Sequence, residues 1–168
     1  MQATPLRCAD CVAVPPPFDA TLALADYRAP LDALVLGLKF RARLMLAREF
    51  ARRLAQRVSD IADEPGGKGQ LPDVIAPVPL ARALGVRADA TLLRRVVETA
   101  PQSRLDLDAR RQNVASAFEV ASDVRGLHVG IVDDVMTTGA TLEAVARVLK
   151  QAGARRVTTL VALRTPKN

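Results

Sequence analysis

Aromatic side chains are scarce in this sequence, and tryptophan is absent. Aromatic residues make up 3% of the 168 residues, which disfavours a surface on which nucleic-acid bases stack, as in RNA-recognition modules. No apolar run approaches the roughly 20 residues that a membrane-spanning helix needs, and no secretory pattern begins the chain. These absences predict a cytoplasmic protein without membrane insertion.

Cysteine and histidine, the usual zinc ligands, are also few. The two cysteines form the pair Cys8-Ala9-Asp10-Cys11, and the single histidine, His128, is distant in the sequence. A closed structural zinc site needs four ligands, so zinc binding by this chain alone is disfavoured. A thioredoxin-like redox pair is poorly supported, because no strand pattern precedes the cysteines.

The residues that are abundant indicate a folded chain with an excess of positive charge. Hydrophobic residues make up 49% and charged residues 25%, and the length fits one domain, with or without a small appendage. The net charge is +6, carried mainly by dispersed arginines. Such an excess is typical of proteins that bind an anionic partner such as phosphate or nucleic acid. Because the arginines are dispersed, a general bias of the composition toward arginine explains the charge equally well.

Hydrophobic periodicity predicts alternating helices and strands. This alternation is typical of an α/β fold with a largely parallel central sheet and flanking helices. A loop rich in proline and glycine is expected over 63–70, and Gly153 is a plausible helix stop. We expect helices over 30–40, 44–58, 105–114 and 140–151, and strands over 73–76, 92–97, 118–120, 127–132 and 157–163.

The segment that carries chemistry runs from Gly130 to Thr141. A buried strand delivers two adjacent carboxylates, Asp133 and Asp134, which are costly there unless they bind cations or polyols. A loop of threonine and glycine follows, and then the start of a helix, which together favour an anion. The combination suits a phosphorylated sugar, with hydroxyls on the acids and phosphate in the loop.

Other interpretations of this segment are weaker. The sequence contains neither a P-loop motif nor the GxGxxG dinucleotide fingerprint. A purely structural role, with the acids capping the next helix, needs only one carboxylate. His128, inside the preceding strand, fits a buried neutral histidine better than a catalytic one.

The stretch from Val132 to Thr141 resembles the motif with which type I phosphoribosyltransferases bind phosphoribosyl pyrophosphate (PRPP). The flanking segments resemble the competence-associated ComF family, also called GntX-like, and this likeness extends from about Cys8 to Arg164. The segments that carry it are Pro15-Pro16-Pro17-Phe18-Asp19, Leu36-Gly37-Leu38-Lys39-Phe40, Pro77-Val78-Pro79-Leu80, Arg111-Gln112-Asn113-Val114 with Ala117-Phe118, and Ala152 to Val157.

The resemblance implies specific roles for these residues. Asp133 and Asp134 would be the catalytic pair, holding the ribose hydroxyls directly or through Mg²⁺. The loop after Val78 would approach the pyrophosphate, and a mobile loop would cover the site. The implied ligand-binding residues are Val135, Met136, Thr137, Thr138, Gly139, Ala140 and Thr141 around the 5′-phosphate, Val78 and Pro79 near the pyrophosphate, and Arg104, Arg110 and Arg111 in the mobile loop. For these three arginines, solvated surface charge is an equally good interpretation.

The chain departs from the family pattern in three ways. Residues 1–17 retain only the last cysteine pair of an N-terminal zinc module plus a linker, so zinc is expected only if the missing cysteines are present; residues 18–168 form the phosphoribosyltransferase-like domain. By comparison with the family pattern and the logic of loop lengths, we expect that about 15–20 residues are missing between Leu80 and Ala81, either from the sequence as given or by a real deletion, which would impair the pyrophosphate side of the site. Thr137 stands where purine-salvage relatives place an acidic residue, and a threonine is no general base at neutral pH.

Two classes of function follow. The first is transfer of ribose 5-phosphate from PRPP, escorted by Mg²⁺, to an unidentified nitrogen acceptor. The second is binding without turnover, as a single-stranded-DNA-binding competence accessory protein or a PRPP-sensing regulator. Competence or recombination proteins are the partners that this second class implies, and a homodimer is compatible with either.

Overall fold

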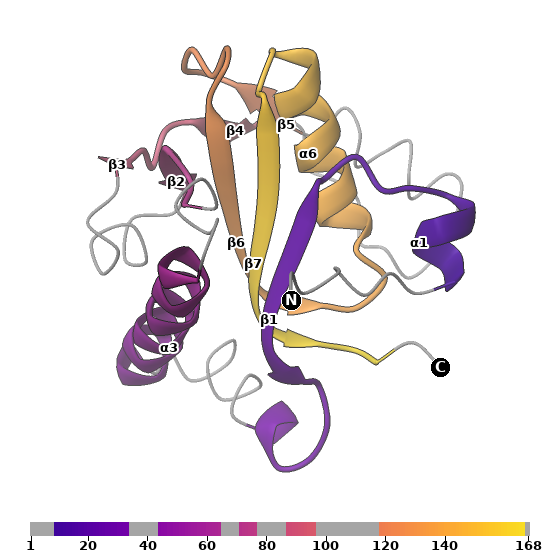
Figure 1. Cartoon of the computed structure of the whole chain (residues 1–168), viewed down its shortest axis with the longest axis vertical. Coiled ribbons are helices and arrows are strands. Elements are labelled where there is room, and N and C mark those ends of the chain that lie inside the picture. The colour runs from indigo at the N-terminus through magenta and orange to yellow at the C-terminus, as the bar shows by residue number, and fades with distance from the viewer. Residues whose placement is uncertain (1–8, 34–43, 65–70, 77–86, 97–117, 167–168) are drawn as a thin grey trace.

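A five-stranded parallel sheet forms the centre of the molecule (Figure 1). The computed structural model describes residues 9–33, 44–64, 71–76, 87–96 and 118–166. The strand order is β1-β7-β6-β2-β3, and all four pairings are parallel. The strands are β1 (Ala20–Asp26), β2 (Val74–Ala76), β3 (Arg87–Ala88), β6 (His128–Met136) and β7 (Arg156–Arg164). The α/β fold with a parallel central sheet is therefore confirmed.

Two amphipathic helices lie on opposite sides of this sheet (Figure 1). Helix α3 (Leu44–Asp63) buries Leu54 and Val58 against Ile75 and Leu160. Helix α6 (Ala140–Gln151) buries its apolar side in the largest core cluster, and its chain reverses at Gly153, where φ is +94°. A short helix, α1 (Ala9–Ala13), and an antiparallel ribbon of β4 (Leu93–Arg95) and β5 (Phe118–Val120) complete the elements. Among the described helices, none is long and apolar enough to cross a membrane.

The predicted helix over 140–151 and the predicted strand over 118–120 have the bounds of α6 and β5. The predicted strands over 73–76, 92–97 and 157–163 match β2, β4 and β7 to within one or two residues at each end, and the predicted helix over 44–58 continues to Asp63. The predicted strand over 127–132 continues to Met136, so Asp133 and Asp134 lie within β6 instead of following it. The extension arises because β7 runs to Arg164 and pairs with β6 along its whole length. Strands β1 and β3 and helix α1 were not predicted. The expected helix over 105–114, most of the helix over 30–40, most of the loop over 63–70 and the junction of Leu80 and Ala81 lie outside the described residues.

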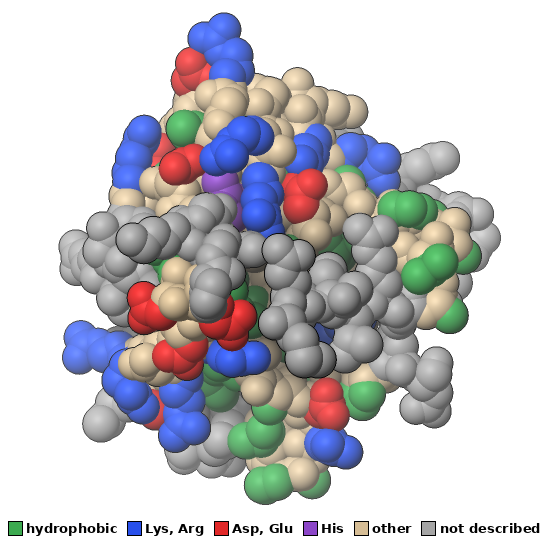
Figure 2. Space-filling view, in the orientation of Figure 1, with side chains coloured by type: hydrophobic (Ala, Val, Ile, Leu, Met, Phe, Trp, Pro, Cys, Tyr) green, Lys and Arg blue, Asp and Glu red, His purple; other side chains and the backbone are tan. Residues whose placement is uncertain are grey.

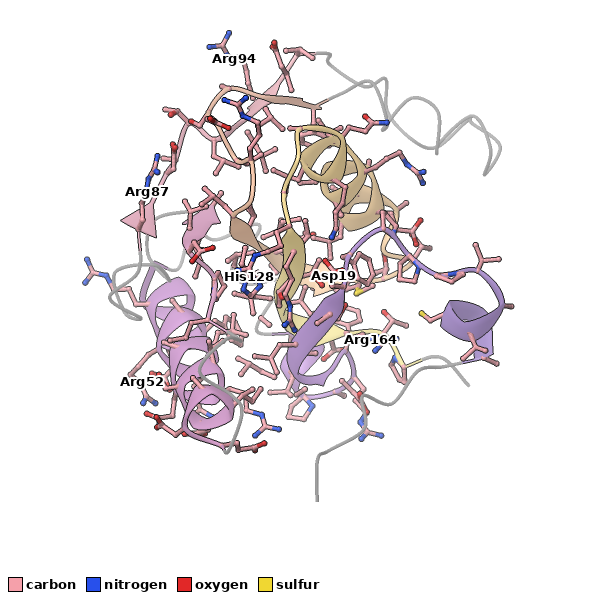
Figure 3. The ribbon with its side chains drawn as sticks, turned by 45° about the horizontal axis from the view of Figure 1, so that its top comes forward. Asp19, Arg52, Arg87, Arg94, His128 and Arg164 are labelled. Carbon is pink, nitrogen blue, oxygen red and sulfur yellow. The ribbon has the colours of Figure 1, made fainter. Side chains whose placement is uncertain are left out.

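His128 is a structural residue, as its pattern predicted (Figure 3). Its side chain is fully buried, with Nδ1 2.9 Å from the Leu71 carbonyl oxygen and Nε2 2.8 Å from Thr158 Oγ1. Because a carbonyl only accepts, Nδ1 carries the proton and the Thr158 hydroxyl donates to Nε2. Burial, aided by the positive charge of Arg156, lowers the pKa of His128 below its ordinary value.

This buried histidine makes stability depend on pH. The folded-state pKa lies below 6.5, the ordinary value, so below about pH 6.5 the unfolded chain binds more protons than the folded chain. The contribution of neutral His128 to the free energy of unfolding should therefore be present in full above this pH. It should decrease as the pH falls below it. Urea unfolding at about pH 7.5 and pH 5.5 measures the decrease. The variant His128→Gln, which does not titrate, should show a smaller decrease, and equal decreases would contradict the assignment.

Candidate functional site

The acid pair lies where a parallel sheet offers its ligand crevice. Strand β2 connects outward to β3 on one side and to β6 on the other, so the strand order reverses between β2 and β6. In open α/β sheets, ligands bind outside the carboxyl ends of the strands at such a reversal. Asp133 and Asp134 lie in the carboxyl-terminal half of β6, directly at this position.

Local hydrogen bonds orient the two half-buried carboxylates. The backbone N–H of Asp134 donates to Asp133 Oδ1 at 2.8 Å, and the N–H of Val135 donates to Asp134 Oδ1 at 2.7 Å. Each carboxylate is thus anchored by one oxygen to the backbone that carries it. The arrangement keeps two negative charges side by side at the sheet edge, which favours a ligand with hydroxyl donors or a cation.

The loop after β6 turns directly into α6. Gly139 occupies the N-cap position with φ at +86°, a left-handed conformation that residues with a Cβ rarely adopt. Its carbonyl accepts from the Glu143 N–H at 2.8 Å, and Thr138 Oγ1 accepts from the Ala140 N–H at 3.4 Å. The start of a 12-residue helix presents backbone N–H groups and a partial positive charge, so this loop fits an anion.

The structure brings nine of the predicted site residues into one continuous strand, loop and helix start. The side chains of Thr137, Thr138 and Thr141 are exposed. The side chain of Met136, in contrast, is buried in the core next to Gly139. Met136 can therefore contact a ligand only through its backbone. Val135 packs against the buried cluster of Ala162 and Leu163. The predicted residues Val78, Pro79, Arg104, Arg110 and Arg111 lie outside the described residues.

The donor set at the acid pair fits magnesium only in company with a ligand. Mg²⁺ prefers oxygen ligands and commonly uses one or two carboxylates together with phosphate oxygens of a substrate. Asp133 and Asp134 supply carboxylates, whereas the described part of the chain contains no group of three or more His, Cys, Asp or Glu side chains that could hold a metal. For zinc, Cys11 lies on α1 and Cys8 is outside the described residues.

A cavity beside the loop was not predicted. It has a volume of about 450 Å³ and lies between the N-terminal segment and the start of α6. Arg147 of α6 and Arg164 at the end of β7 line it together with Thr137 and Thr138. Arg164 pairs in register with Met136 of β6, which brings it to the loop, and no pattern within its own segment indicates this.

The chain is similar to several known proteins. The family described as "Phosphoribosyl transferase domain" matches residues 44–168. A "DNA utilization protein YhgH" from Salmonella typhimurium is 37% identical over 172 residues, covering 90% of this chain and 75% of that protein. "Competence protein F" from Haemophilus influenzae is 29% identical over 174 residues, with the same shares covered. Hypoxanthine phosphoribosyltransferase from Trypanosoma cruzi, a solved structure, is 22% identical over 72% of each chain, with a TM-score of 0.42.

Proposed function

The chain belongs to the phosphoribosyl transferase domain family, as a ComF-like member, and from that premise we propose that its acid pair and threonine loop bind PRPP with Mg²⁺. One observation supports this most: strand β6 carries two half-buried carboxylates, and the loop that follows it turns at a left-handed glycine into the start of α6. The carboxylates suit the ribose hydroxyls, and the loop suits the 5′-phosphate.

The proposed reaction asks for little covalent chemistry from the protein. The bond between ribose C1 and the pyrophosphate oxygen breaks, and pyrophosphate leaves with the electron pair. A new bond forms from C1 to a nitrogen acceptor, which gives up its proton to solvent. Asp133, Asp134 and the loop position the sugar and stabilise the positive charge that develops on it. Mg²⁺, bound together with the phosphates, supplies neutralisation of the leaving group's charge.

A thermal-shift titration tests the proposal. PRPP with Mg²⁺ at about 100 times its Kd should stabilise the protein by about 2.7 kcal/mol. For a chain of this length, that raises Tm by about 5–10 °C. Ribose 5-phosphate should give a smaller shift, because it lacks the pyrophosphate. Absence of any shift with PRPP would contradict the proposed function.

A second function, binding of single-stranded DNA, is favoured by the exposed face of α3. Within residues 48–57, four arginines, Arg48, Arg52, Arg53 and Arg57, accompany a single acid, Glu49, and all four are exposed. Glu49 accepts hydrogen bonds from both Arg52 and Arg53, which lowers its pKa to about 2. Figure 2 shows basic side chains over α3 at the lower left, with acidic ones among them. The names of the relatives, which concern DNA utilization and competence, agree with such a role.

If α3 contacts phosphates, salt should weaken binding steeply. For single strands, each phosphate contact contributes about −0.7 to the slope of log K against log salt concentration. The double variant Arg53→Gln/Arg57→Gln should make this slope less negative by about 1.4. Fluorescence anisotropy with a labelled oligothymidine at several salt concentrations measures it. Arg125→Gln, which changes an exposed arginine paired with Asp123, is the control. An unchanged slope in the α3 variant would argue against this surface.

A further inference from the structure

The cavity beside the threonine loop has the size of a small-molecule site. Its volume of about 450 Å³ lies within the roughly 300–1,000 Å³ of ligand pockets. One wall is formed by the N-terminal segment, including Pro16, Pro17 and Phe18. The opposite wall comes from α6 and the end of β7, and Thr137 and Thr138 join it to the predicted phosphate loop.

The cavity contains two arginines that lack acidic partners. Arg147 and Arg164 form no ion pair within the described part of the chain, a property they share with the exposed Arg48, Arg57 and Arg94. By contrast, Arg28, Arg52, Arg87, Arg125 and Arg155 each lie within 4 Å of an aspartate or glutamate oxygen. Glu143 lies four residues before Arg147 on α6, a spacing at which opposite charges commonly pair. Among the described residues, Glu143 also forms no ion pair, and all three side chains line the cavity. Figure 3 shows Arg164 near the ends of β1 and β7, on the side of α1.

The rest of the lining narrows the class of ligand. Two guanidinium groups match the oxygens of a phosphate, which they bind by paired hydrogen bonds. The proline segment and the side chain of Phe18, which is 9% exposed, offer an apolar wall for a ring. The Glu143 carboxylate only accepts hydrogen bonds, so its complement is a hydroxyl or amino group. A dianion, an apolar ring and hydroxyl donors occur together in a nucleoside monophosphate.

We propose that this cavity binds a nucleoside monophosphate as a second ligand, with its phosphate on Arg147 and Arg164 and its base against Pro16, Pro17 and Phe18. The site is separate from the acid pair but shares Thr137 and Thr138 with the loop. A ligand in the cavity therefore contacts the same segment as the sugar phosphate, which couples the two affinities reciprocally. The coupling rests on the proposed function, whereas binding of the nucleotide does not.

Calorimetric titration of the whole chain with AMP, and then with GMP and UMP, tests the proposal. The titrations are repeated with ribose 5-phosphate at saturation, because a nucleotide that occupies the threonine loop would then be displaced. The variant is Arg147→Gln/Arg164→Gln, and the matched control is Arg125→Gln/Arg155→Gln, two exposed arginines that precede the amino-terminal ends of β6 and β7. The Tm of each unliganded variant verifies folding, and Arg147→Gln alone serves if the double variant is unstable.

The expected result is binding of at least one nucleotide that persists at saturating ribose 5-phosphate. It should weaken at least tenfold in the cavity variant and stay unchanged in the control. Binding of no nucleotide, binding that the cavity variant retains, or complete competition with ribose 5-phosphate would each overturn the proposal. If PRPP gives no thermal shift but a nucleotide binds through Arg147 and Arg164, the proposed function fails and the cavity site stands.

Discussion

Replacing both Asp133 and Asp134 by asparagine should abolish the thermal shift that PRPP and Mg²⁺ produce. Hydrogen bonds to a charged group contribute about 1.5–3 kcal/mol each, so losing both charges should weaken binding by about a hundredfold or more. At a ligand concentration that raises the Tm of the natural sequence by about 5–10 °C, the variant should shift by less than about 2 °C. Differential scanning fluorimetry with and without ligand measures both.

The unliganded double variant should remain folded, which separates binding from stability. Asparagine keeps the oxygen that accepts the backbone N–H of the next residue, the bond seen at both Asp133 and Asp134. Removing two adjacent negative charges also relieves their repulsion. Asp123→Asn is the matched control, because Asp123 is exposed and pairs with Arg125 away from the loop. A full shift in the double variant would show that the ligand does not use these carboxylates.

The strand, loop and helix of the candidate site could be predicted because their signals are local. The helix over 140–151 was predicted with the bounds of α6, since its apolar residues and Gly153 lie within one short segment. The end of β6 was not predicted, because Asp133 and Asp134 end the apolar pattern. Pairing with β7 extends the strand regardless of that pattern.

Strand β1 was missed because what stabilises it is distant in the sequence. Its partner is β7, and one side-chain contact between them, Thr21 Oγ1 to Thr159 Oγ1 at 2.8 Å, joins residues 138 positions apart. The segment itself alternates leucine with alanine, so its hydrophobic period is weak. The sequence also indicated no cavity, because its walls come from the N-terminal segment, the loop, α6 and the end of β7.

The roles of individual arginines can be inferred only from their neighbours in the structure. In the sequence, Arg147 and Arg164 resemble every other arginine. In the structure, several exposed arginines pair with acids, as Arg125 does with Asp123, whereas these two line a cavity. The pyrophosphate side of the site stays a prediction, since Val78, Pro79, Arg104, Arg110 and Arg111 are outside the described residues.

Replacing Gly139 by alanine should weaken PRPP binding at least tenfold, about 1.4 kcal/mol. Gly139 has φ at +86°, and a Cβ there would lie 2.8 Å from Met136 Cε. The left-handed conformation costs a residue with a Cβ about 1–2 kcal/mol. An alanine at this position therefore either remains strained or moves the backbone out of this conformation. Relaxation would turn the N–H groups of the loop away from the 5′-phosphate, and small displacements of binding groups cost much affinity. The thermal-shift titration with PRPP and Mg²⁺ measures this loss.

Gly126→Ala separates the loss of binding from the loss of stability. Gly126 also has a positive φ, +71°, but a Cβ there would meet nothing within 4 Å. Both variants should therefore lower the Tm of the unliganded protein by about 2–8 °C from backbone strain, with the larger decrease for Gly139→Ala because of Met136. Only Gly139→Ala should reduce the shift caused by PRPP. Equal responses to PRPP in the two variants would mean that the conformation of the loop does not hold the phosphate, and the carboxylates of β6 would then have to bind the sugar without it.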